Sequence, residues 1–315
     1  MSQPLRLSFV VPAYKVAGVI GTALHSLYDT CTPLPDNWEL EVVVVEDGSP
    51  DRAALLETLT AFPQVRLVTH EQNRGITAAR NTGLKATTGD IVTILDADDE
   101  LVPGWSQVMV EILKEWPVEA NLCFSACLDL DGRVTSSDPD YTGPFTFEDM
   151  LCERHVGEYL PHFRGPFIRE RSLIDLGTRR DCNSLYYLTF LQEGSGWMTA
   201  KILRLYHCRV GAEMRKWTSQ DFAWQLARCY EAMFEKFGAE YRAKAPRIYR
   251  SKLLRYAIYL KLAKKPGAWK AWTQGAHWSC LKETFGAFLM LIFGSGFTAW
   301  LVEKAKKLGV IKRYG

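Results

Sequence analysis

Several signatures of common protein classes are missing from this sequence of 315 residues. It has no Gly-x-Gly-x-x-Gly segment and no Gly-Lys-Ser/Thr loop, which counts against a dinucleotide-binding fold and against a P-loop ATPase. The eight cysteines are scattered and only Cys123 and Cys127 lie close together, so a zinc site is not expected. Free thiols in a reducing cytoplasm explain them most simply. The N-terminal segment is too short and polar for a signal peptide, so we expect a cytoplasmic protein.

Acidic residues are almost absent from the C-terminal part of the chain. From Arg242 to Gly315 there are 16 Lys and Arg but only two acids, Glu283 and Glu303. Residues 1–241 carry 22 basic and 34 acidic residues. Because the charges are segregated in this way, they bear on the partners of the protein rather than on its fold.

Apolar runs alternate with helical periodicity over the first hundred residues. Strands are predicted over 7–12, 40–45, 65–69 and 91–95, and helices over 16–27, 53–62 and 76–86. The strands are nearly continuous apolar runs, which is typical of a parallel sheet buried on both faces. Strand–helix alternation of this length predicts right-handed βαβ units, and therefore an α/β fold with an open, mostly parallel sheet flanked by helices.

Acidic residues follow two of these strands. Asp47 ends the second strand, and Asp96, Asp98 and Asp99 follow the strand at 91–95. Ligands of open α/β sheets bind beyond the carboxyl ends of the strands. Side-chain alternation predicts Asp96 and Asp98 on one side and Asp99 on the other. Carboxylates at this edge suit Mg²⁺ or Mn²⁺ with a phosphate completing the coordination, although a solvated acidic turn is the simpler alternative.

Four segments in this order resemble family 2 glycosyltransferases. They are Phe9-Val10-Val11-Pro12-Ala13-Tyr14, Val45-Glu46-Asp47-Gly48-Ser49-Pro50-Asp51, Asn73-Arg74-Gly75 with Ala79-Arg80-Asn81-Thr82-Gly83, and Gly89-Asp90 with Leu95-Asp96-Ala97-Asp98-Asp99. The resemblance is strong over residues 5–105, weak over 106–215 and absent beyond. It implies a GT-A fold and an inverting, metal-assisted transfer of one sugar from a UDP- or GDP-sugar to an acceptor hydroxyl.

The resemblance also implies roles for individual residues on the donor side. Pro12, Ala13, Tyr14 and Asp47 would hold the nucleotide base and ribose, and Arg80 would lie near the base or the diphosphate. For Arg80 the simpler alternative is a surface ion pair along its helix.

A divalent metal, Mn²⁺ or Mg²⁺, is expected at the Asp-x-Asp segment. By resemblance Asp98 is the direct metal ligand and Asp96 contacts the ribose or a metal-bound water. His207, in the apolar run 203–209, is a further candidate ligand of the metal or diphosphate, but a single His in a strand is more often structural.

The general base is harder to place. Asp181 precedes a helix-like run at 185–191, where the family carries Glu-Asp before a helix, and it is our candidate base. The Glu of that pair is missing, and a helix cap is nearly as good an explanation of Asp181. Glu148 and Asp149 form another acid pair, but Thr146 before them predicts a capping box. The alternative function is therefore a non-catalytic nucleotide-sugar-binding or assembly partner that has lost its base.

The basic C-terminal part admits several interpretations. Phe285 to Val302 carries no charge and is marginal for a transmembrane span, and it also suits a buried helix pair. A basic amphipathic segment with aromatic anchors on an anionic bilayer fits best, whereas the acidic body argues against nucleic acid. We expect a transferase domain over 1–215 and a helical, membrane-surface appendage over 216–315. The acceptor would be a glycan or lipid-linked, in surface polysaccharide or glycolipid assembly on the inner face of the cell membrane.

Overall fold

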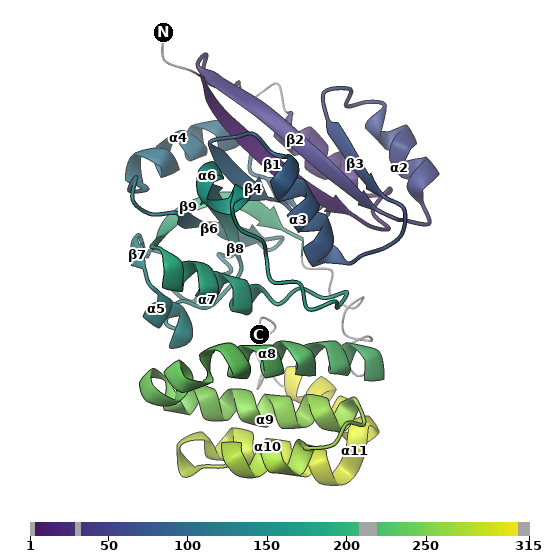
Figure 1. The fold of residues 1–315 in the computed structure, drawn as a ribbon, viewed down its shortest axis with the longest axis vertical. Helices are drawn as coiled ribbons and strands as arrows, with labels where there is room; N and C mark the ends of the chain where they lie inside the picture. The colour runs from purple at the N-terminus through teal and green to yellow at the C-terminus, as the bar shows by residue number, and fades with distance from the viewer. Residues whose placement is uncertain (1–3, 29–32, 208–218, 308–315) are drawn as a thin grey trace. The chain divides into compact units, whose positions relative to one another are not determined.

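The chain forms two compact units in a computed structural model that describes residues 4–28, 33–207 and 219–307. The first unit comprises residues 1–147 and 155–208, and the second comprises 148–154 and 209–315. Figure 1 shows strands and helices in the first unit and helices in the second. The domain boundary that the sequence places near residue 215 lies outside the described residues.

The first unit is built on one large sheet. Its strands are β1 (Leu5–Ala13), β2 (Trp38–Asp47), β3 (Arg66–His70), β4 (Ile91–Ile94), β5 (Glu100–Leu101), β6 (Leu122–Asp129), β7 (Gly143–Phe145), β8 (Tyr159–Arg164) and β9 (Gly196–Tyr206). Their order is β3-β2-β1-β4-β8-β6-β9-β5, with β7 on β9. The four strands predicted from the sequence are parallel to one another, as expected. Beyond β4 the sheet is mixed, because β8 runs antiparallel to both β4 and β6.

Helices cover this sheet. They are α1 (Ile20–Leu27), α2 (Arg52–Leu59), α3 (Ile76–Ala86), α4 (Trp105–Glu115), α6 (Gly165–Arg169) and α7 (Asn183–Glu193), whereas α5 (Phe147–Leu151) belongs to the second unit except for its first residue. On one face the ring of Phe9 packs edge-on against Trp105 of α4. On the other, α3 lies so close to the sheet that a Cβ on Gly83 would be 2.3 Å from Val10 Cγ1. Both faces of β1 are therefore buried, in agreement with its continuous apolar sequence.

One boundary differs from the sequence prediction. Pro12 was expected to end the first strand, but β1 continues to Ala13 and Pro12 pairs with Val45 of β2. Strand β4 pairs with β1 only as far as Val10. The missing N–H of Pro12 therefore lies beyond that ladder and interrupts nothing on that side.

The second unit is helical. It contains α8 (Gln220–Lys244), α9 (Pro246–Leu262), α10 (Ala268–Gly275), the 3-10 turn η1 (Trp278–Cys280) and α11 (Leu281–Lys307), which is broken at Gly294 with φ of +77°. The segment 148–154 joins this unit through ion pairs from Glu148 to Lys244 (3.1 Å) and from Glu153 to Lys252 (2.5 Å). Among the helices described, including the one that contains Phe285 to Val302, none combines the length and apolar character needed to cross a bilayer.

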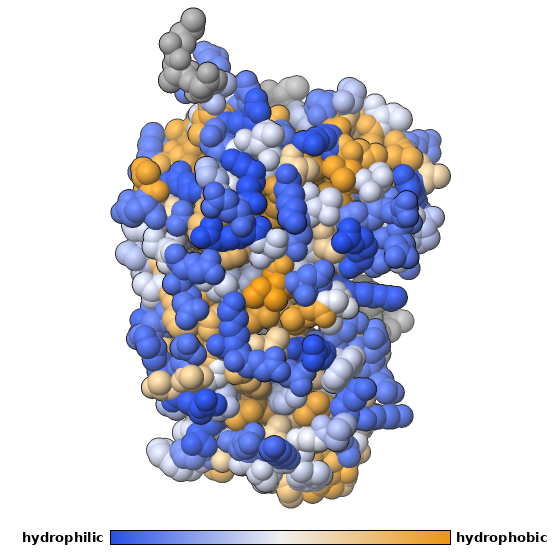
Figure 2. All heavy atoms as spheres, in the orientation of Figure 1, coloured by the Kyte–Doolittle hydropathy of each residue, from blue (hydrophilic) through white to orange (hydrophobic). Residues whose placement is uncertain are grey.

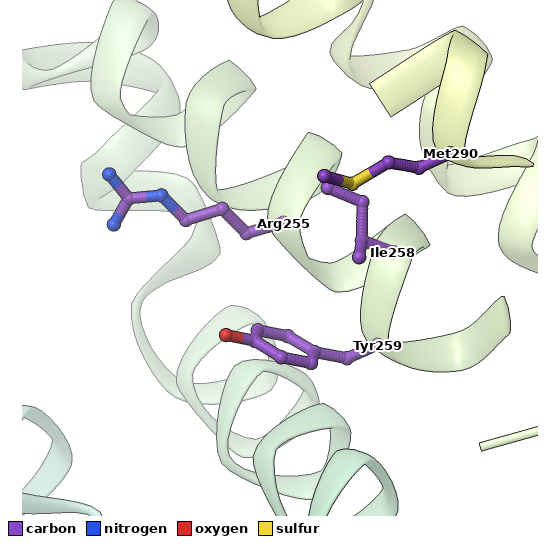
Figure 3. Close-up of a pocket in the computed structure, with 4 residues that line it drawn as sticks. All are labelled: Arg255, Ile258, Tyr259 and Met290. Atoms are coloured by element: carbon purple, nitrogen blue, oxygen red, sulfur yellow. The ribbon is translucent and has the colours of Figure 1, made fainter. Parts of the chain in front are cut away.

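A small cavity lies within the helical unit. Arg255, Ile258 and Tyr259 of α9 and Met290 of α11 line it, and its volume is about 80 Å³. Figure 3 shows the Met290 side chain reaching toward Ile258, with the Arg255 guanidinium directed away from that apolar wall. Ligand pockets usually have volumes of several hundred Å³. This cavity is therefore too small to hold a nucleotide sugar.

Candidate functional site

The carboxylate of Asp47 organises the loop that precedes α3. It is 2% exposed and accepts hydrogen bonds from the backbone N–H groups of Arg74 and Gly75, both at 2.9 Å. The Nδ1 of His70 lies 2.7 Å from it. Gly48 follows with φ of +62°, and a Cβ there would lie 2.3 Å from the carbonyl carbon of Gln72. The end of β2 is thus packed backbone to backbone against the turn at 72–75.

A second pair of loops meets at the same edge of the sheet. The backbone N–H of Lys15 donates to Ser49 Oγ at 2.7 Å, and that of Ala17 donates to Asp51 Oδ2 at 3.1 Å. Pro12 and Ala13 are buried, whereas Tyr14 is 40% exposed. The loops after β1 and β2 therefore hold each other in place and leave the ring of Tyr14 facing solvent.

Arg80 links two of the predicted site residues. This arginine of α3 is 7% exposed, and its guanidinium donates to Asp96 Oδ1 at 2.6 Å and to Asp181 Oδ2. Burial opposes its charge, but the two carboxylates raise the pKa of Arg80 well above its ordinary value. Arg80 is therefore a buried cation held between two acids, and the alternative of a surface ion pair does not apply.

The pair that Arg80 forms with Asp96 affects the acid as well. Burial alone would raise the pKa of Asp96, yet Arg80 and Arg204 hold it below its ordinary value. Asp96 is therefore ionised at neutral pH and keeps a partly exposed side chain (34%). The Nε of Arg80 is buried and has no hydrogen-bond partner among the described residues, which calls for an explanation in a native structure.

The acids after β4 differ in burial, and the chain turns between them, with the Asp99 N–H bonded to the Asp96 carbonyl. Asp96 and Asp98 are half-buried, whereas Asp99 is 1% exposed. Asp99 accepts from Arg204 Nη1 at 3.0 Å and from the backbone N–H of His207 at 2.9 Å. Burial raises the pKa of Asp99 to about 7, against the opposing effect of Arg204. Asp99 thus joins the segment after β4 to β9, whereas Asp96 and Asp98 keep part of their surface exposed.

The residues present fit a divalent metal held in part by substrate. No group of three or more His, Cys, Asp or Glu side chains in the described parts of the chain is arranged to hold a metal alone. Mg²⁺ usually binds one or two carboxylates and takes its other oxygens from phosphates and water. The half-buried Asp96 and Asp98 satisfy that requirement. The Nε2 of His207 lies 2.8 Å from Glu100 Oε1 but makes no hydrogen bond to the described residues, so a role of His207 at the metal stays a prediction.

Asp181 is brought into the same cluster, but it is enclosed there. Its side chain is 9% exposed. Besides Arg80, Thr77 Oγ1 donates to it at 3.2 Å, and the hydroxyl of the buried Tyr186 lies 3.0 Å away. Asp181 lies one residue before the N-cap of α7, which is Cys182, and Cys182 makes no side-chain cap hydrogen bond. Asp181 therefore acts mainly as a partner of Arg80 in this structure.

Two residues of the site have no motif in the sequence. Arg204 is 4% exposed and lies in β9, and Glu158 stands just before β8 with Oε2 3.6 Å from Arg204 Nη2. The side chain of Glu158 is 46% exposed. The only sequence signal for Arg204 is a charge within the apolar run 202–206, and Glu158 has none.

Comparisons with known proteins identify the family of the chain. The sequence profile of Glycosyl transferase family 2 matches residues 8–165. The succinoglycan biosynthesis protein ExoO of Rhizobium meliloti is 36% identical over 231 residues, which is 64% of each chain. The uncharacterized glycosyltransferase YibD of Escherichia coli is 32% identical over 159 residues, 48% of this chain and 44% of that protein. The chain thus spans less than two thirds of either relative.

Solved structures resemble the chain in fold. TarS 1–349 of S. aureus in complex with UDP has a TM-score of 0.58 at 15% identity, covering 91% of each chain. The mannosyltransferase PcManGT of Pyrobaculum calidifontis, in complex with GDP-Man and Mn²⁺, has a TM-score of 0.53 at 19% identity, covering 96% of this chain and 87% of that one. These likenesses confirm the GT-A type of fold with C-terminal helices that the sequence predicts.

Proposed function

We propose that this chain, which belongs to glycosyl transferase family 2, a family of transferase enzymes, moves one sugar from a nucleoside diphosphate sugar to an acceptor hydroxyl with inversion. The observation that carries the proposal is the cluster beyond β4, where Asp96 and Asp98 are half-buried beside a guanidinium with an unused N–H. Carboxylates for a metal and a cation for a diphosphate are the chemistry that such a donor requires.

The loops after β1 and β2 would receive the nucleoside. Tyr14 presents an exposed ring, and Pro12 and Ala13 fix the backbone that carries it. Because the carboxylate of Asp47 already accepts two backbone N–H groups, we propose that it serves the nucleotide chiefly by shaping the turn at 73–75. The donors UDP-GlcNAc and GDP-Man bound by solved relatives make uridine and guanosine diphosphate sugars the classes to test.

The diphosphate would lie against Arg80 and the two acids. Asp98, with Asp96, would hold the divalent metal, which when bound acts as a Lewis acid toward the leaving diphosphate. The buried Nε of Arg80 would donate to a diphosphate oxygen, which supplies the partner that the described residues do not. Arg80 also fixes Asp96 in its ionised form and in one orientation. Such fixed groups need no reorganisation as charge develops on the leaving oxygen.

The acceptor is proposed to be a glycan or a lipid-linked sugar in surface polysaccharide or glycolipid assembly. The name of ExoO, a succinoglycan biosynthesis protein, supports the polysaccharide setting. The helical unit supports a membrane-bound acceptor, because large apolar side chains are exposed on it, including Trp278 (80%), Phe285 (61%) and Trp300 (50%). In Figure 2 hydrophobic residues reach the surface among hydrophilic ones on the face shown. Aromatic anchors among basic residues suit the surface of an anionic membrane.

Thermal unfolding with a panel of nucleoside diphosphates and their sugars, with and without Mn²⁺, tests the donor site. A ligand that binds only the folded protein raises the melting temperature by mass action. We expect a metal-dependent rise with a uridine or guanosine diphosphate that Asp98→Ala abolishes, while Asp131→Ala, an exposed surface acid, retains it. If no nucleotide shifts the melting temperature of the wild-type protein, the donor site is refuted.

A further inference from the structure

The transfer proposed above needs a group that removes the proton of the acceptor hydroxyl. A general base requires a free oxygen within hydrogen-bond reach of the acceptor. Asp181 meets this requirement poorly, because its side chain is 9% exposed and its oxygens face Arg80, Thr77 and Tyr186. The base must therefore be sought among other carboxylates at the same edge of the sheet.

Glu158 stands where such a carboxylate is needed. Strand β8 runs antiparallel to β4, with Thr93 opposite His162. The pairing ends at Thr93, but Arg204 contacts both Asp99, which follows β4, and Glu158, so Glu158 lies near the carboxyl end of β4. Its side chain is 46% exposed, about five times the exposed fraction of Asp181. Glu158 is thus both close to the acidic cluster and open to a second substrate.

Partial burial of Glu158, whose side chain is 46% exposed, is the largest influence on its pKa, and the charge of Arg204 opposes it. Arg204 lies between Asp99 and Glu158, with its Nη1 3.0 Å from Asp99 Oδ2 and its Nη2 3.6 Å from Glu158 Oε2. The contact with Glu158 is the longer of the two and involves only one of its two carboxylate oxygens, Oε2. Burial of Glu158 raises its pKa, Arg204 lowers it, and Asp96 raises it further, with a net pKa above the ordinary value. A raised pKa makes a carboxylate a stronger base.

Other carboxylates beside this cluster are less suited. Asp99 is 1% exposed and bound by Arg204. Glu100 is 26% exposed and its Oε1 lies 2.8 Å from the ring of His207. Asp96 is bound by Arg80, and with Asp98 it is assigned to the donor and its metal.

We propose that Glu158 is the catalytic base of the transfer and that Asp181 is a positioning residue for Arg80. One oxygen of Glu158 takes the proton of the acceptor hydroxyl. The electron pair of that O–H bond forms the new bond to the anomeric carbon, and the bond from this carbon to the diphosphate breaks with its electron pair on the leaving oxygen. The proton on Glu158 then passes to solvent. This inference rests on the proposed function, because it assumes a bound donor sugar.

Two small acceptors test the inference without knowledge of the natural one. Water must lose a proton as it attacks the donor, whereas the azide anion has none to lose. We would measure release of nucleoside diphosphate from the sugar nucleotide selected by the thermal panel, with water alone and with added sodium azide. The proteins compared are the wild type, Glu158→Gln, Asp181→Asn and, as a matched control, Glu170→Gln, whose side chain is 80% exposed.

Loss of a general base lowers a rate by about 10²–10⁴-fold. For Glu158→Gln we expect a fall of that size with water and a rate within a few-fold of wild type with azide, with donor binding unchanged. Asp181→Asn should lower the rates with water and with azide by the same factor, and Glu170→Gln should change neither rate. The assignment would be overturned if Glu158→Gln lowered the rates with water and with azide equally. It would also be overturned if Asp181→Asn lowered only the rate with water. The absence of donor binding in the wild type would instead refute the proposed function.

Discussion

The two units differ in how they use charge: the α/β unit joins several buried charges in one cluster, whereas the helical unit buries Lys252 in a single ion pair and exposes other lysines. In the α/β unit the charged cluster is buried, with Arg80, Arg204 and Asp99 at most 7% exposed. Arg80 forms an ion pair with Asp96, and Arg204 forms one with Asp99. In the helical unit, lysines such as Lys261 and Lys270 lie exposed on the surface. Burying an ion is costly unless its partners are fixed, whereas a surface charge costs little and is screened by salt. The buried cluster therefore indicates a site that needs rigid charges, and the exposed lysines indicate a surface that attracts a partner from a distance.

Removing the buried cation should produce the largest effect on stability. Arg80→Met leaves the Asp181 carboxylate buried without its cation and removes the partner of Asp96. Breaking a buried ion pair from one side costs about 3–5 kcal/mol. We expect a loss of that size in the free energy of unfolding, measured by urea denaturation.

The double variant is the control for this interpretation. Adding Asp181→Asn to Arg80→Met removes the unpaired buried charge, so part of the lost stability should return. If the loss of unfolding free energy in the double variant equals the sum of the losses in the two single variants, Arg80 and Asp181 are not energetically coupled. The two side chains would then not form an ion pair in the folded protein.

The sequence predicts this cluster only in part, for physical reasons. Helix α3 was predicted over its full length, because its bounds follow from local periodicity. The predicted alternation of Asp96, Asp98 and Asp99 assumed an extended segment, whereas the chain turns there, with the Asp99 N–H bonded to the Asp96 carbonyl. Arg204 and Glu158 were missed, because they reach the cluster through strand pairings beyond β4 that no local pattern encodes. The contact of Arg80 with Asp181 joins residues 101 positions apart.

The second prediction concerns a buried group that the α/β unit keeps neutral. His162 is fully buried in β8, with Nδ1 2.7 Å from Thr93 Oγ1 and Nε2 2.9 Å from Ser125 Oγ, so it joins β4 to β6. Burial lowers the pKa of His162 to about 3. Between that value and the ordinary pKa of about 6.5, the unfolded chain binds a proton that the folded chain does not, so acid destabilises the fold.

The variant His162→Gln keeps polar groups at this position but cannot titrate. Linkage gives about 1.4 kcal/mol per pH unit for one whole proton, and the unfolded histidine is half protonated at pH 6.5, so between pH 6.5 and 5 the wild type should lose about 1.6 kcal/mol more unfolding free energy than the variant. Urea denaturation at a series of pH values measures this difference. Parallel pH profiles of the two proteins would mean that His162 is not held neutral in the folded state.

The smallest effects on stability are expected in the helical unit, where the same kind of charge serves a different purpose. The variants Lys261→Gln and Lys270→Gln change exposed side chains, so each should alter the unfolding free energy by less than about 0.5 kcal/mol.

On vesicles that contain anionic lipid, each lost cation should weaken binding by about 1 kcal/mol, and high salt should weaken it further. Lys114→Gln makes the same change on the surface of the α/β unit and is the matched control. Sedimentation with the vesicles measures the bound fraction. Equal vesicle binding by the Lys114 and Lys270 variants would mean that the helical unit is not the membrane-facing part. The exposed lysines of that unit would then not serve to attract a membrane.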